Sequence, residues 1–350
     1  MTFVPRSPWL RGGLVLASLA VAALVVWWRG PSWGLVAEAF TAVAWRWVVV
    51  ALLLNLLSVV VRALAWRTVI DQAMPEPHPT AVQVFSSFSI GLLANAALPA
   101  RAGELVRIGV LRRHLPPRRG LWATLAGTVF AHRVFDLVAV TVLVLYVLVE
   151  ARIPAWAVTS LVVVVALGAV LLGIAVAAAQ RHTVDVGREL GRIRGLVTMA
   201  RQGLGVMRSP LGATAALVAQ CVGWALQLLA VWAAMEAFRI DEPLAAAGLV
   251  LLLMNVASIF PLWPGNVGLV QAAVALPLVS YGITYAHGFA FGIGLQAIEA
   301  SVGIGAGLVF LAHEGISFAA MRLLPGGEDE GPPEVPVEAR ARAERAGVPG

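Results

Sequence analysis

Long apolar runs, separated by short polar segments rich in arginine and proline, form the pattern along the chain. Two of them, Val48 to Val61 and Leu161 to Ala179, approach or reach the ~20 apolar residues that a helix needs to cross a bilayer. Strands of membrane β-barrels alternate apolar and polar residues over about 10 residues, and these runs do not alternate. The pattern therefore predicts an all-α, polytopic helical membrane protein.

About six full spans and two interrupted elements are expected, which makes eight hydrophobic elements in all. The first span has no small-residue cleavage site after its apolar stretch, so it is interpreted as a retained helix and not as a signal peptide. The two interrupted elements are apolar but broken by proline, glycine and asparagine, which is typical of helices that enter the membrane and turn back. The expected full spans are 12–28, 47–66, 121–149, 156–179, 211–236 and 289–312, and the interrupted elements are 80–99 with the segment that follows it, and 244–280.

The placement of arginine along the chain indicates on which side of the membrane each loop lies. The segment 101–119 carries six Arg and one Glu, and the segment 180–210 carries six Arg against Asp185 and Glu189. Basic loops stay on the cytoplasmic side. Both segments do so if the first interrupted element is re-entrant. The Arg-containing tail also returns to the inside if 244–280 is a second re-entrant element that enters from the opposite face. We expect a multi-pass protein of the plasma (inner) membrane, with a cytoplasmic N-terminus over 1–11, a transmembrane domain over 12–315 and a disordered cytoplasmic tail over 316–350.

Composition agrees with lipid as the main solvent. The chain is 60% hydrophobic and only 13% charged, about half the charged fraction of a soluble domain. All 25 basic residues are Arg, and since they lie mainly between spans, the net charge of +6 is explained by topology and no nucleic-acid partner is expected. The chain has a single cysteine, Cys221, so no internal disulfide is expected. Its six His residues show no metal-ligand spacing, and no metal site or cofactor is expected.

The two interruptions resemble each other. Pro99 and Gly103 have the same P-x-x-x-G spacing as Pro264 and Gly268. Proline ends the incoming half-helix, and glycine permits a sharp turn or a close helix approach. Broken helices at matching places in two halves of a chain indicate an inverted repeat with a substrate site between the halves. The match is short, so chance is the alternative explanation. Pro261 and Gly265 belong to the second interruption.

The first candidate site follows the first interruption and contains Arg101, Glu104 and Arg107. A half-helix that begins inside the membrane presents free N–H groups and a partial positive charge, which suit a phosphate head group. Arginine adds planar forked donors. Glu104 and Arg107 are three residues apart and can pair on one helical face. The alternative is that these arginines only mark the cytoplasmic side, which is the interpretation favoured for Arg112, Arg113, Arg118 and Arg119.

The second candidate site is His132-Arg133-Val134-Phe135-Asp136, inside the span 121–149. Charges at that depth are costly and usually face a bundle interior or a wet cavity. Arg133 and Asp136 can neutralise each other, either as a structural ion pair or as a head-group contact or proton relay.

Polar residues inside other spans complete the candidates. Glu299 lies in the middle of the Gly-rich last span. It is expected either to carry a proton or to pair with Arg62 or Arg133. Asn55 and Asn95 are expected either to bridge helices or to contact substrate.

Three segments taken in order resemble a known family: Leu98 to Arg107 (LPARAGELVR), His132-Arg133-x-x-Asp136 and Pro261-x-x-Pro-Gly-x-x-Gly268. They are similar to the transmembrane region of lysylphosphatidylglycerol synthases, a family that includes stand-alone flippase-like membrane proteins. The resemblance covers roughly 10–315. It departs from the family pattern at Gln271, where the family often has Glu, and near Gln296, where it often has a basic residue.

The resemblance implies movement of a phospholipid or lipid-linked precursor between leaflets. In two-part synthases a separate soluble domain transfers the amino acid, and the short tail here leaves no room for one, so synthase activity is not expected. The expected partners are membrane lipids. One alternative is an accessory or scaffold subunit for a separate lipid-modifying enzyme. Another is a membrane-embedded enzyme using His132 and Asp136, although no recognisable catalytic motif is present. The Gly-rich last span suits packing within the chain or against a second copy.

Overall fold

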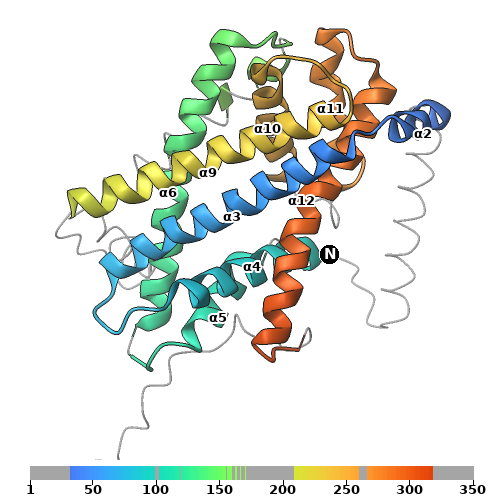
Figure 1. Ribbon diagram of the computed structural model, residues 1–350. Coiled ribbons are helices and arrows are strands. Elements are labelled where there is room, and N and C mark those ends of the chain that lie inside the picture. The colour runs from blue at the N-terminus through green and yellow to red at the C-terminus, as the bar shows by residue number, and fades with distance from the viewer. Residues whose placement is uncertain are drawn as a thin grey trace, which may run out of the picture. The chain divides into compact units, whose positions relative to one another are not determined.

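The computed structural model describes residues 32–98, 102–118, 120–154, 209–259 and 266–317, with a few further positions between 156 and 170. All regular structure in these ranges is helical (Figure 1). The helices are α2 (Trp33–Thr41), α3 (Trp45–Ala73), α4 (Ala81–Ala97), α5 (Gly103–Arg112), α6 (Leu121–Glu150), α9 (Pro210–Ala237), α10 (Leu244–Ile259), α11 (Leu269–Leu278), the 3-10 turn η5 (Val279–Tyr281) and α12 (Tyr285–His313).

Four helices are long and apolar enough to cross a membrane: α3, α6, α9 and α12. They confirm four of the expected spans and extend several of them by a few residues. The spans expected at 12–28 and largely that at 156–179 lie outside the described residues, as do the basic segment 180–208 and most of the tail. The prediction of a polytopic helical membrane protein is confirmed.

The chain divides into two compact units. The division cuts all four long helices, so each of these helices contributes residues to both units. Unit 1 contains Met1–Ser58, Ala139–Gly168 and Gly223–Val302. Unit 2 contains Val59–Val138, Ala169–Val222 and Gly303–Gly350. Each unit holds one of the two interrupted elements as a pair of short helices, α10 and α11 in unit 1 and α4 and α5 in unit 2.

The two short-helix pairs have matching lengths. In unit 2, α4 has 17 residues and α5 has 10; in unit 1, α10 has 16 and α11 has 10. At about 1.5 Å per residue, α5 and α11 are each about 15 Å long, half the hydrocarbon thickness of about 30 Å. Within each pair the two helices pack against each other. The interrupted elements are therefore hairpins, and they share the long-then-short pattern that an inverted repeat predicts.

Local sequence explains where the unit 2 hairpin begins and turns. Thr80 and Gln83 form a reciprocal capping box, in which the Gln83 N–H donates to the Thr80 hydroxyl and the Thr80 N–H donates to the Gln83 side chain. At the other end, Leu98 is extended, with φ −103° and ψ 145°, because the next residue in the sequence is proline.

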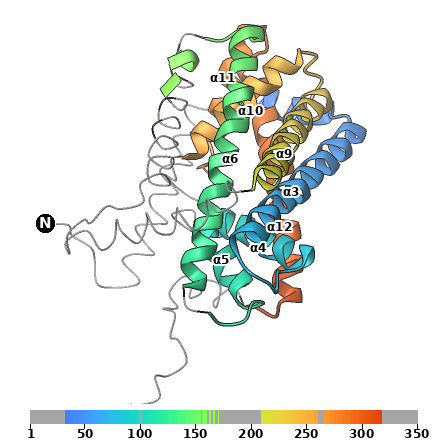
Figure 2. The same cartoon turned by 90° about the vertical axis from the view of Figure 1, so that its left-hand side faces the viewer.

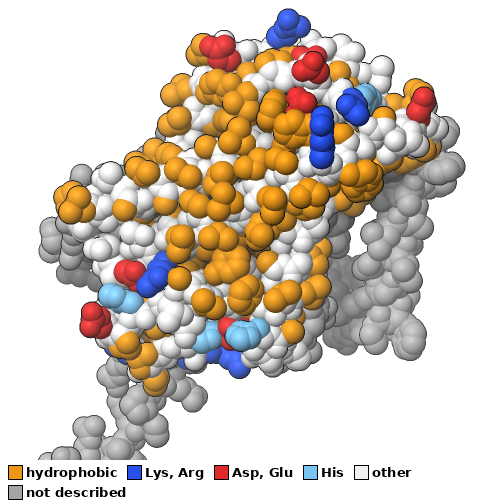
Figure 3. All heavy atoms as spheres, in the orientation of Figure 1, with side chains coloured by type: hydrophobic (Ala, Val, Ile, Leu, Met, Phe, Trp, Pro, Cys, Tyr) orange, Lys and Arg blue, Asp and Glu red, His pale blue; other side chains and the backbone are white. Residues whose placement is uncertain are grey.

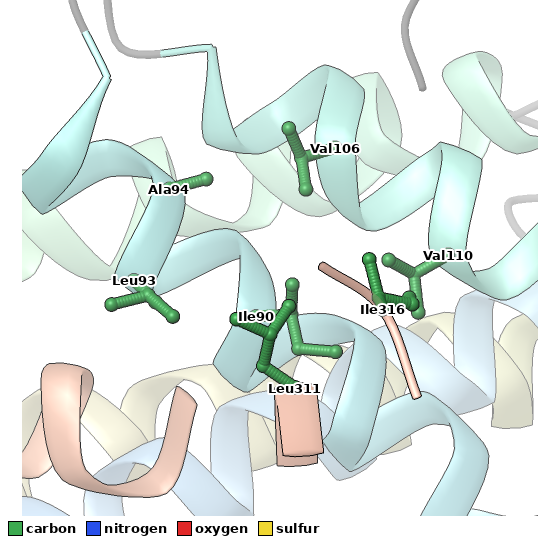
Figure 4. Close-up of a cluster of buried hydrophobic side chains, with 7 residues drawn as sticks. All are labelled: Ile90, Leu93, Ala94, Val106, Val110, Leu311 and Ile316. Carbon is green, nitrogen blue, oxygen red and sulfur yellow. The ribbon is translucent and has the colours of Figure 1, made fainter. Parts of the chain in front are cut away.

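Inside this hairpin the backbones of α4 and α5 touch. A Cβ placed on Gly103 would lie 2.1 Å from the Gly91 carbonyl oxygen, and a Cβ on Gly91 would lie 3.0 Å from the Gly103 oxygen. The 2.1 Å distance at Gly103 rules out a side chain there unless the helices separate, whereas the contact at Gly91 is tight. The hairpin then packs on the end of α12 through a buried apolar cluster (Figure 4), which consists of Ile90, Leu93, Ala94, Val106, Val110, Leu311 and Ile316.

The hairpin of unit 1 uses its glycine differently. Gly268, directly before α11, has a φ of 92°, a backbone conformation that side chains rarely adopt, so it makes a sharp turn. The short helix then packs closely on α12, where Cβ atoms at Gly288 and Gly292 would lie 3.0 Å from the Cα atoms of Ala275 and Gln271. The two P-x-x-x-G glycines thus have different roles, a close approach at Gly103 and a turn at Gly268.

Large apolar side chains remain exposed along the long helices. In the space-filling view, hydrophobic side chains gather over α3, α9 and α12 (Figure 3). A water-soluble protein rarely exposes such continuous apolar surface, whereas lipid solvates it. The exposed residues on these helices include Val49, Leu53, Leu57, Leu64, Val218, Val222, Leu308 and Val309.

Candidate functional site

Unit 2 brings the predicted charged residues of three helices together. Arg62 comes from α3, Glu104 and Arg107 come from α5, and His132, Arg133 and Asp136 come from α6, with Gln220 of α9 added. Figure 2 shows α5 beside the first half of α6, which makes these contacts possible. We call these seven residues the arginine–carboxylate cluster.

Asp136 is the centre of the cluster. Its Oδ1 accepts from Arg62 Nη2 at 3.0 Å and from the Gln220 side-chain amide, and its Oδ2 accepts from Arg133 Nη1 at 2.8 Å. Asp136 is buried, and three donors compensate the cost of removing its charge from water. The expected Arg133–Asp136 pair is present, and Arg62 proves to be a second arginine on the same carboxylate.

Glu104 joins α5 to α6. One oxygen pairs with Arg107 Nη2 at 2.5 Å, as the three-residue spacing predicts, and the other accepts from Arg133 Nη2. Arg133 thereby bridges Glu104 and Asp136 with its two terminal nitrogens. The two candidate sites that the sequence keeps apart are one cluster in the structure.

Arg107 is the buried cation of the cluster, with 4% of its side chain exposed. Its guanidinium lies 4.6 Å from the centre of the Trp66 ring and 5.4 Å from that of Phe88, so two aromatic faces stabilise the charge where water is absent. Trp66 is fixed in turn by a hydrogen bond from its Nε1 to the Thr128 hydroxyl at 3.1 Å. Arg107 therefore holds Glu104 in place and is enclosed by protein.

His132 is also enclosed. It is 1% exposed, its Nε2 donates to the Arg62 carbonyl oxygen at 3.2 Å, and its Nδ1 lies 3.8 Å from Asp136 Oδ2. Its ring packs edge-on against Phe88. These contacts make His132 a spacer between α3, α4 and α6.

Arg133 differs from the other charged members of the cluster, because 48% of its side chain is exposed, against 4% to 30% for the other ionic partners. Phe130, one turn before it on α6, is an exposed apolar residue, and Leu105, which follows Glu104 on α5, is exposed as well. The cluster thus meets the surroundings of unit 2 mainly through the side chain of Arg133.

Asn95 closes the hairpin from within, since its Oδ1 accepts from the Gly103 N–H at 2.9 Å. Of the two roles expected for it, this contact is the helix bridge. Several predicted residues of the two interruptions, namely Pro99, Arg101, Pro261, Pro264 and Gly265, lie outside the described residues.

Unit 1 holds Glu299 in a separate polar network. Its Oε1 accepts from the Gln227 side-chain amide at 2.8 Å, and Gln227 Oε1 accepts from the Ser58 hydroxyl at 3.3 Å. Asn55, one turn before Ser58 on α3, is also buried. Arg62 and Arg133, the arginines expected as partners of Glu299, both bind Asp136, and Arg133 also binds Glu104.

The side chains of Gln271 on α11 and Gln296 on α12 contact each other. The Gln271 side-chain amide donates to Gln296 Oε1, and Gln271 Oε1 also accepts from the Gly268 N–H at 2.5 Å. The neutral side chains at these positions are therefore a matched pair that closes the turn before α11 onto α12.

Sequence reasoning missed five polar residues of these networks: Ser58, Trp66, Thr128, Gln220 and Gln227. The two glutamines are seven residues apart, two helical turns, on an otherwise apolar span. A polar side chain buried in a span usually faces a polar partner, so their spacing is the signal that could have found them. Among the described residues, no group of three or more His, Cys, Asp or Glu side chains is placed to hold a metal ion.

The spanning helices, the two hairpins and the buried ionic cluster define a polytopic membrane protein with a polar centre inside its spans. Residues 15–307 match the family described as "Lysylphosphatidylglycerol synthase TM region", and the chain belongs to that family. It is an integral membrane protein whose family is concerned with lipid modification or transport. Comparisons with curated proteins and with solved structures gave no match.

Proposed function

We propose that the protein translocates a membrane lipid, a phospholipid or a lipid-linked precursor, between the leaflets of the plasma (inner) membrane. The arginine–carboxylate cluster carries the proposal: three guanidinium groups and two carboxylates lie together on helices that span or enter the bilayer. Such a group is costly in lipid and is kept where a polar ligand or water passes. The family membership supports a lipid as that ligand.

In the proposed mechanism the lipid head group passes Arg133, while the acyl chains stay in the bilayer beside Phe130. The hairpin α4–α5 presents Glu104 to that path, and the hairpin α10–α11 is the corresponding element of unit 1. Hairpins of this kind gate transport by alternating access in other transporters. In this proposal the protein is not an enzyme, both termini are cytoplasmic and membrane lipids are the partners.

The enzymatic alternative has weaker support, because His132, its only candidate base, is enclosed and donates to a backbone carbonyl. The alternative of an accessory subunit for a lipid-modifying enzyme makes a different prediction. A scaffold tolerates the loss of a half-exposed charge if its packing is kept, whereas a translocator does not.

The test is leaflet exchange in liposomes that contain the purified protein and fluorescent phospholipids of different head groups. Exchange above that of empty liposomes is expected, with a loss of at least tenfold in Arg133→Ala. Arg113→Ala is the matched control, because Arg113 is an exposed arginine at the end of α5 outside the cluster. Glu299→Gln tests whether the path includes the polar network of unit 1. Equal exchange in Arg133→Ala and Arg113→Ala would refute the proposal.

A further inference from the structure

The position of Arg133 along its helix is the starting point. Arg133 lies about 4 Å along the axis from the midpoint of α6, taking about 1.5 Å per residue over Leu121–Glu150. A half-exposed arginine side chain at that depth is costly against acyl chains. A polar ligand or water must therefore face it.

The donors left on Arg133 indicate what that ligand offers. A guanidinium carries five N–H groups. In the described structure one is used by Asp136 and one by Glu104, which leaves three N–H groups of Arg133 for an outside acceptor. A planar set of donors that stays charged matches the several oxygens of a phosphate group.

The carboxylates of the cluster, in contrast, already face arginine. Both oxygens of Asp136 accept from arginine, one of them also from Gln220, and each oxygen of Glu104 lies against Arg133 or Arg107. An ammonium group on a ligand would have to compete with an arginine for either carboxylate. The cluster therefore favours a ligand that accepts hydrogen bonds over one that donates them.

The charges lead to the same conclusion. Among the described residues the cluster contains three arginines and two carboxylates, so the charges of these five side chains sum to one positive charge. That sum favours an anionic ligand over a cationic one. The exposed apolar side chain of Phe130, one turn before Arg133 on α6, distinguishes an anion that carries acyl chains from a free one in water.

We propose that the arginine–carboxylate cluster binds the phosphate of an anionic lipid at Arg133 and selects against head groups that carry an ammonium. This selectivity rests on the proposed function, since it concerns the head group that the translocator accepts. It also excludes the lysine-bearing lipid of the family description as a preferred ligand.

Binding is tested on the full-length protein in nonionic detergent by isothermal titration calorimetry with dioctanoyl lipids. The probes are phosphatidylglycerol, phosphatidylcholine, phosphatidylglycerol esterified with lysine, and inorganic phosphate. Phosphatidylglycerol is expected to bind at least tenfold more tightly than either ammonium-bearing lipid. Equal affinity for these three lipids, or tighter binding of the lysine ester, would overturn the inference.

Variants and the inorganic anion separate the remaining outcomes. Arg133→Ala is expected to lose the preference for phosphatidylglycerol, and Arg113→Ala is expected to keep all of it. Arg133→Lys is expected to keep part of the preference, because lysine keeps the positive charge but lacks the planar, forked set of donors of a guanidinium. Arg133→Lys decides the result if the alanine variant does not fold. Inorganic phosphate is expected to bind more than tenfold more weakly than the anionic lipid. Equal binding of the two would assign the site to a soluble anion and overturn the lipid inference.

Failure of this inference is distinguishable from failure of translocation. Tight and selective binding of phosphatidylglycerol without leaflet exchange supports the anionic site and refutes the translocator. Leaflet exchange that is equal for anionic and ammonium-bearing lipids supports the translocator and refutes the selectivity.

Discussion

Replacing Gly103 by alanine tests whether contact between the backbones of α4 and α5 holds the cluster together. The new Cβ would lie 2.1 Å from the Gly91 carbonyl oxygen and 2.6 Å from the Asn95 side chain, where ordinary contact begins at 3.4 Å. The two helices must therefore separate by roughly 1.3 Å. Overpacking of this kind typically costs about 1–3 kcal/mol, and loss of the Gly103 N–H bond to Asn95 adds about 1 kcal/mol.

The expected loss of stability is thus about 2–4 kcal/mol in Gly103→Ala. It is measured as the midpoint of unfolding with increasing sodium dodecyl sulfate in mixed micelles. Because Glu104 is the next residue and pairs with two arginines, leaflet exchange is expected to fall as well. Asn95→Ala removes the hydrogen bond without the clash, so it should cost only about 1 kcal/mol.

The matched control is Gly305→Ala, because a Cβ at Gly305, on an exposed face of α12, meets no atom within 4 Å. The same chemical change there should leave stability unchanged or slightly raised. If Gly103→Ala were as stable as Gly305→Ala, the backbone contact would not support the hairpin, and the explanation of this glycine would be wrong.

Three further predictions concern other contacts. Gln271→Glu should destabilise unit 1 by about 1–3 kcal/mol in detergent unfolding, because it puts a charge at a buried position. Adding Gln296→Lys should recover most of that loss, and if the effects of the two substitutions on stability simply added, the pairing of these residues would be contradicted. Arg107→Lys should lower the unfolding midpoint by the equivalent of about 1–2 kcal/mol, since lysine keeps the charge and loses the planar stacking; an unchanged midpoint would refute the stacking role. Glu314→Gln should cost less than about 1 kcal/mol by the same measurement, because it weakens one partly exposed pair with His114; a larger loss would show a stronger role for that pair.

The spans could be predicted from the sequence because apolar runs of membrane length have few alternatives. The breaks could be predicted because proline and glycine act locally. The pairs Glu104–Arg107 and Arg133–Asp136 follow from helical spacing alone, and both are present. These features depend on neighbours within one helix.

Contacts between helices could not be predicted in the same way. Nothing in the spacing of α3 indicates that Arg62 reaches Asp136, or that Trp66 supports a buried arginine of α5. Such contacts depend on how helices rotate about their axes, which in lipid is set by packing and not by hydrophobicity. The pairing of Gln271 with Gln296 was hidden for the same reason, although both positions had been noted.

The apolar cluster between the hairpin α4–α5 and the end of α12 has a consequence for biosynthesis. Ser86 on α4 donates to Glu314 just after α12, and 228 positions of sequence separate them. At about 5–20 residues per second, a ribosome needs about 10–45 s to make that stretch. During this time Ile90 and Val106 lack the side chains of Leu311 and Ile316 that later cover them. The hairpin α4–α5 is therefore covered on this face only after α12, the last helix among the described residues, has been made.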